Sequence, residues 1–71
     1  MMPITIGKPG ERYLIRKITG RDEVRQHLAE LGFVLDTEIV IVSELFGNLI
    51  LQVRDSRIAL DKTMANRILV S

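Results

Sequence analysis

Along the chain, a segment of strand-forming residues is followed by a segment whose hydrophobic positions have the period of a helix. The range Arg12–Ile18 is rich in β-branched and aromatic residues, which predicts a first strand. An apolar stripe with helical spacing comes next, formed by Val24, Leu28 and Leu31. We therefore expect an amphipathic helix over Asp22–Leu31. Gly32 stands where a glycine in the left-handed conformation commonly ends a helix.

The second half of the chain predicts four more short strands. They span Glu38–Leu45, Leu49–Arg54, Arg57–Leu60 and Arg67–Val70. Phe46–Asn48 predicts a hairpin loop, and Asp55-Ser56 predicts a tight turn. Asp61 can cap one helical turn over Lys62–Asn66. The pattern favours a mainly β fold, a small SH3-like barrel of about five strands in a single domain over residues 1–71. A helix follows the first strand, and a one-turn helix precedes the last.

The composition requires a core held together by hydrophobic packing. The 71 residues include no cysteine, which excludes disulfides and cysteine-ligated zinc, and 46% of them are apolar. No apolar run approaches the ~20 residues of a spanning helix, so we expect no direct membrane insertion. The absence of cysteine and of a signal-peptide core favours the cytoplasm. Because so small a domain cannot bury all of its apolar side chains, we expect some of them to face a partner or a second copy of the chain.

The residue types give little support to catalysis. The chain has no cysteine, a single histidine and three serines, and none of the serines lies in a nucleophile elbow. Gly7 and Gly10 lack the strand-to-helix context of a phosphate-binding loop. We therefore expect no enzymatic activity and no tightly bound cofactor.

Two longer segments carry a family resemblance. Arg25–Phe33 reads R-x-x-L-x-x-L-G-F, and Ile58–Val70 contains A-L-x(4)-A-x-x-I-x-V. With Gly47–Val53 as a central hairpin, these segments resemble the ferrous iron transport protein A (FeoA) family, in the family's order and spacing. One departure is that Leu35-Asp36 stands where the family usually has Pro-Gly.

The resemblance to the FeoA family implies an SH3-like fold and a function in ferrous iron uptake. Such a protein is expected to be a small cytoplasmic accessory or regulatory protein. It would act by protein–protein interaction with FeoB, the membrane ferrous iron transporter, and not by catalysis.

Exposed apolar residues are the candidates for that interaction. They are Val34, Leu35, Leu45, Phe46 and Ile50. Phe46 lies at a predicted hairpin tip beside Gly47 and can anchor an interface, since aromatic residues often dominate binding energy. The alternative is that Phe46 folds back as a lid on the end of the barrel. The same surface can also form a homo-oligomer.

The single histidine raises the question of a metal site. In a helix, Glu23 and Glu30 lie on the side of His27, at i−4 and i+3, so these three residues are candidates for a weak site that binds iron or zinc. A tight site needs about three or four converging ligands, which one exposed helix face supplies poorly. The alternative is a solvated helix face, with iron contacting the protein weakly or through the transporter.

Nucleic acid binding is the alternative function, because small barrels often bind single strands. Arg16, Lys17, Arg21 and Arg25 form a local basic region. The three aromatic residues, Tyr13, Phe33 and Phe46, are widely separated in sequence, whereas such barrels stack bases on clustered aromatics. Nucleic acid is therefore the less favoured partner, and the basic region can instead face an acidic protein.

Overall fold

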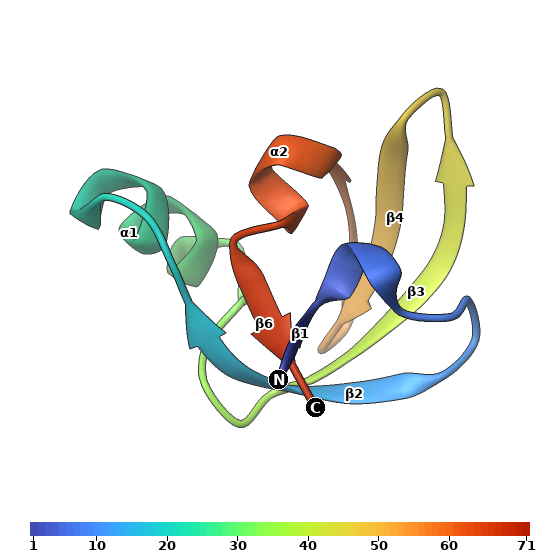
Figure 1. The fold of residues 1–71 in the computed structure, drawn as a ribbon, viewed down its shortest axis with the longest axis horizontal. Coiled ribbons are helices and arrows are strands. Elements are labelled where there is room, and N and C mark those ends of the chain that lie inside the picture. The colour runs from blue at the N-terminus through green and yellow to red at the C-terminus, as the bar shows by residue number, and fades with distance from the viewer.

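Six antiparallel strands form one curved sheet in the computed structural model, which describes residues 1–71 (Figure 1). The strands are β1 (Met2–Pro3), β2 (Arg12–Ile18), β3 (Glu38–Leu45), β4 (Asn48–Val53), β5 (Ser56–Asp61) and β6 (Ile68–Val70). Their order across the sheet is β1-β6-β2-β3-β4-β5. A 3-10 helix, η1 (Ile4–Ile6), and two α-helices, α1 (Asp22–Glu30) and α2 (Lys62–Ala65), complete the fold. Neither α-helix has the length and apolar composition needed to cross a bilayer.

The predicted elements are confirmed, with small shifts at their ends. β2 and β3 have the bounds expected from the sequence, and α1 ends one residue early because Leu31 is its C-cap. The tight turn between β4 and β5 lies one residue earlier than the predicted Asp55-Ser56. It consists of Arg54 and Asp55, since Val53 and Ser56 are already paired, and Arg54 has a φ of 53°.

The prediction of about five strands missed the N-terminal segment. Met2 pairs with Val70 and Pro3 with Leu69, so β1 forms an edge of the sheet, where proline is tolerated. η1 then directs Ile4 into the core, where the side chain is fully buried. A strand of two residues that contains proline is too short to give a periodic signal. Its position depends on the C-terminal strand that it pairs with.

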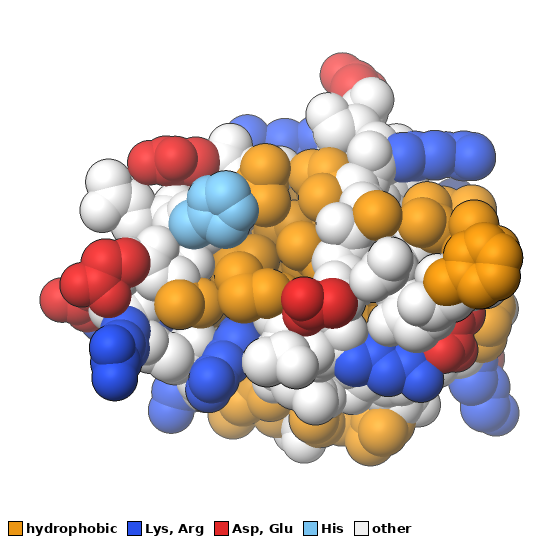
Figure 2. Space-filling view, turned by 90° about the horizontal axis from the view of Figure 1, so that it is seen from above, with side chains coloured by type: hydrophobic (Ala, Val, Ile, Leu, Met, Phe, Trp, Pro, Cys, Tyr) orange, Lys and Arg blue, Asp and Glu red, His pale blue; other side chains and the backbone are white.

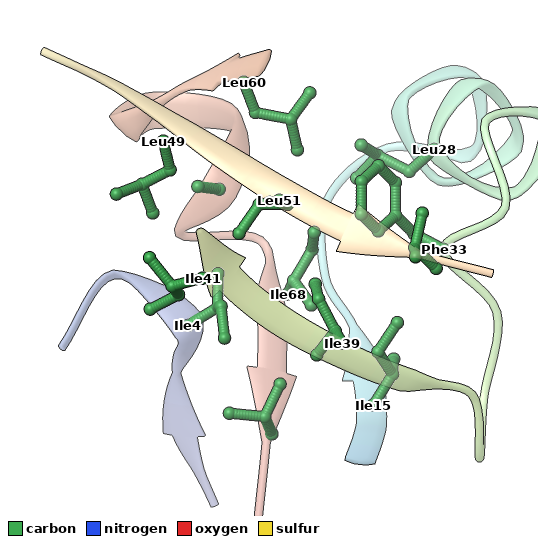
Figure 3. Close-up of a cluster of buried hydrophobic side chains, with 13 residues drawn as sticks. Ile4, Ile15, Leu28, Phe33, Ile39, Ile41, Leu49, Leu51, Leu60 and Ile68 are labelled. Carbon is green, nitrogen blue, oxygen red and sulfur yellow. The ribbon is translucent and has the colours of Figure 1, made fainter. Parts of the chain in front are cut away.

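The core is entirely apolar. Its thirteen buried residues are Ile4, Ile15, Leu28, Phe33, Ile39, Ile41, Leu49, Leu51, Val53, Leu60, Ala65, Ile68 and Val70. They come from the strands, from η1, α1 and α2, and from the segment that follows α1. Figure 3 shows that they meet between the curved layers of the sheet. No polar or charged residue is among the buried residues.

Two β-bulges change which side chains face the core. In β2 the pairing with β6 shifts between Ile15 and Lys17, and in β3 the pairing with β4 shifts between Ile41 and Ser43. An extra residue in one strand reverses the alternation of side chains beyond it. Each bulge therefore places two consecutive side chains on the outer surface, and both surfaces matter for the candidate sites.

Candidate partner-binding surfaces

The tip of the β3–β4 hairpin exposes its largest side chain. Leu45 pairs with Asn48, so the turn consists of Phe46 and Gly47, which both have positive φ (52° and 81°), as a type I′ turn requires. The Phe46 side chain is 94% exposed, so it does not fold back as a lid on the barrel.

The bulge in β3 aims the neighbouring residues of the tip. Beyond the bulge Glu44 faces α2, where its carboxylate lies 2.7 Å from the Lys62 ammonium, and Leu45 points to the outer surface, where it is 56% exposed. Ile50 lies two positions from Asn48 on β4, on the same outer face as Leu45, and is half-buried. We call Leu45, Phe46 and Ile50 the hairpin-tip surface.

A groove lies between β2 on one side and α1, with the loop that follows it, on the other. It has a volume of about 420 Å³. Five apolar residues line it: Ile18, Ala29, Phe33, Val34 and Leu35. Three basic residues complete the lining, namely Arg16, Lys17 and Arg25, and no acidic residue does. We call this feature the basic groove.

The bulge in β2 explains why two basic side chains lie together in the basic groove. Arg16 and Lys17 are both exposed, whereas Ile15 before them is buried and Ile18 after them packs against the core. Strict alternation would have turned Lys17 inward. The sequence shows the basic residues, but the register shift that brings them to one face depends on the pairing with β6.

The structure divides the five predicted partner-binding residues between two places. Leu45, Phe46 and Ile50 form the hairpin-tip surface, while Val34 and Leu35 line the basic groove. Figure 1 shows the tip of the β3–β4 hairpin and the loop after α1 at opposite sides of the molecule. A single partner would have to span both surfaces to use all five residues.

The three predicted metal-binding residues lie on one helix but do not converge. Glu23, His27 and Glu30 are all exposed on α1. No group of three or more histidine, cysteine, aspartate or glutamate residues is arranged to hold a metal ion.

Figure 2 shows hydrophobic side chains reaching the surface in the middle of the face that carries the helices, with acidic and basic side chains mostly at its margin.

Comparison with known proteins decides the family. The model of the FeoA domain matches residues 2–71. The chain belongs to the FeoA family. A protein of Methanocaldococcus jannaschii, named as a provisional Fe(2+) transport protein A, is 26% identical over 70 residues, which are 99% of this chain and 85% of that protein.

Solved structures agree with this FeoA assignment. The crystal structure of an iron uptake regulatory protein, FeoA, is 28% identical with a TM-score of 0.88, covering 99% of this chain and 93% of that one. FeoA of Stenotrophomonas maltophilia, complexed with zinc, is 25% identical with a TM-score of 0.87, covering 100% and 91%. It is described as a prokaryotic SH3 domain protein and a suggested activating factor of ferrous iron transport. The predicted SH3-like fold and FeoA resemblance are thereby confirmed.

Proposed function

We propose that this FeoA-family chain is a cytoplasmic accessory protein that regulates ferrous iron uptake. It acts by binding the cytoplasmic part of a FeoB-type membrane transporter and not by catalysis. The family assignment and the names of the relatives support a function in ferrous iron transport. The apolar core without a single buried polar side chain supports binding at the surface over chemistry in an enclosed site.

Phe46 is the observation that carries the proposal. A residue other than glycine in the left-handed region is disfavoured by roughly 1–2 kcal/mol. An aromatic ring that stays exposed contributes no hydrophobic free energy to folding. Phe46 combines both disadvantages, with a φ of 52° and 94% exposure. Strained residues at an exposed site are a reason to look for function. A partner that buries the ring would offset both unfavourable contributions, so we place the transporter at the hairpin-tip surface.

The positions of the aromatic side chains make nucleic acid a less suitable partner. Phe33 is fully buried, and Tyr13 packs against the core, with its hydroxyl donating to Glu11 and accepting from the Lys8 amide at 2.9 Å. Phe46 is therefore the one well-exposed ring. Proteins that bind single strands stack successive bases on several rings.

Iron enters this proposal as the cargo of the transporter. The zinc in the S. maltophilia structure belongs to that protein. In the present chain Glu23, His27 and Glu30 remain candidates for weak binding of iron or zinc, without a converging set of ligands. We therefore expect iron to contact the protein weakly or through the transporter.

Capture of a partner tests the proposed function. The purified chain is immobilised and presented with the cytoplasmic part of its organism's ferrous transporter and, separately, with single-stranded DNA, over a series of salt concentrations. We expect capture of the transporter part to weaken far less with rising salt than the binding of DNA would, because the apolar contact at the hairpin-tip surface releases few counterions. Retention of DNA at moderate salt without capture of the transporter would favour a nucleic-acid-binding barrel instead. Self-association without capture would favour a homo-oligomer.

A further inference from the structure

The basic groove combines an apolar floor with positive charge and lies away from the hairpin-tip surface. Phe33 and Val34 form part of its apolar lining, and Leu35 beside them is 60% exposed. The charges come from Arg16 and Lys17 on one wall and Arg25 on the other. A concave apolar site with a few convergent polar groups is the usual form of a binding site.

The positive charges of the groove are available to a ligand. Lys17 makes no ion pair within the chain, whereas Arg16 lies 3.1 Å from the Asp36 carboxylate and Arg25 pairs with Asp22. Both of these carboxylates are largely exposed to water. Because exposed ion pairs contribute about 0–1 kcal/mol, a carboxylate of a partner can replace either of them at little cost.

The guanidinium of Arg16 is already oriented by hydrogen bonds in the free chain. Its Nε donates to the Ser71 hydroxyl at 2.8 Å, and its Nη1 donates to Asp36. The backbone of Asp36 is fixed as well, since its amide donates to the Ile15 carbonyl at 2.8 Å. The guanidinium therefore loses little freedom on binding, which favours affinity.

We propose that the basic groove binds an acidic, extended segment of the transporter's cytoplasmic part. An apolar side chain of that segment would lie against Val34 and Leu35, and its carboxylates would meet Lys17 and the two arginines. The proposal rests on the proposed function and adds a second contact to it. Nucleic acid fits less well because the ring in the groove, Phe33, is fully buried and cannot stack on a base. An anionic membrane fits less well because the site is concave.

Charge-reversal variants test the groove. Lys17→Glu places a negative charge in it, while Lys8→Glu makes the same change of net charge at an exposed residue in the turn before β2. Leu35→Ser removes the apolar contact at an exposed position, so all three variants should fold. We expect Lys17→Glu and Leu35→Ser to weaken binding of the transporter part about tenfold and Lys8→Glu to leave it nearly unchanged. Equal effects of the two charge reversals would contradict binding in the basic groove, while the proposed function would still hold.

If the transporter part does not bind at all, the proposed function fails. Amide NMR then tests by itself whether the basic groove binds an acidic segment. The probes are a short synthetic peptide alternating aspartate and leucine, its asparagine counterpart, vesicles containing anionic lipid, and single-stranded DNA. We expect the aspartate peptide, and not its counterpart, to shift the amides of Lys17, Arg25 and Leu35. An unresponsive groove would overturn the proposal. So would larger shifts of the same amides with vesicles or DNA.

Discussion

The backbone amide of Phe33 donates a hydrogen bond to the Leu28 carbonyl at 3.0 Å, and both side chains are fully buried. The amide of Gly32 donates to the Ala29 carbonyl at the same distance, and Gly32 has a φ of 107°. These two bonds form a Schellman motif, which commonly includes an apolar contact across the helix end. Figure 3 shows Leu28 and Phe33 side by side in the core. The motif thus ends α1 and anchors it to the barrel.

Replacement of Gly32 tests this anchor. A Cβ at this position would lie 3.6 Å from Val53 Cγ1, which is an ordinary contact, so the loss in Gly32→Ala comes from the backbone conformation. We expect the free energy of unfolding to fall by about 1–2 kcal/mol, measured by urea denaturation. A fall below about 0.5 kcal/mol would show that the turn relaxes without strain.

Two isoleucines of η1 test the N-terminal segment. Ile4 is fully buried and Ile6 is 67% exposed. Ile4→Ala should lower the free energy of unfolding by about 2–5 kcal/mol, because it leaves a cavity in the core. Ile6→Ala should change it by less than about 0.5 kcal/mol. Similar thermal unfolding midpoints for the two variants would contradict the placement of this segment.

Asp61 links β5 to α2. Its Oδ1 accepts a hydrogen bond from the Met64 amide at 2.8 Å, as an N-cap does. Asp61→Ala should therefore lower the free energy of unfolding by about 1 kcal/mol, while Asp61→Asn, which keeps a capping oxygen, should lower it less. Equal losses in chemical denaturation would mean that the capping hydrogen bond does not account for the contribution of Asp61.

Much of the fold could be predicted because most elements carry their own signal. The apolar stripe of α1, the β-branched content of β3 and the capping aspartate before α2 are local features of the sequence. β1 and η1 could not be predicted, because their positions depend on pairing with β6 and on a core built by the rest of the chain. The bulges also depend on strand pairing, although the consecutive charged residues Arg16 and Lys17 between Ile15 and Ile18 interrupt the alternation of β2.

The candidate sites were predicted residue by residue but not as surfaces. Phe46 stood out as an aromatic residue beside a glycine, and the structure exposes it. The basic groove was missed because Lys17 joins Arg16 on the face of Val34 and Leu35 only through the bulge in β2. A sequence gives the order of charged residues along the chain. A groove depends on how closely separate elements, here β2 and α1 with its following loop, lie in the folded structure.

The turn at the hairpin tip gives a prediction about stability. Asn-Gly is the favoured sequence of a type I′ turn, and Phe46-Gly47 occupies that position here. Phe46→Asn should therefore raise the free energy of unfolding by about 1 kcal/mol, since asparagine tolerates the left-handed conformation better. A variant less stable than the original chain in urea would indicate that the ring packs on the barrel.

The affinity of the Phe46→Asn variant for the transporter's cytoplasmic part tests the central claim most directly. Because this variant should be at least as stable as the original chain, a loss of binding cannot come from unfolding. Ile6→Asn, which removes an exposed apolar side chain of η1 elsewhere on the surface, is the control. We predict that Phe46→Asn weakens binding about tenfold or more in a titration calorimetry measurement, while Ile6→Asn does not. Unchanged affinity of Phe46→Asn would contradict docking through the hairpin tip.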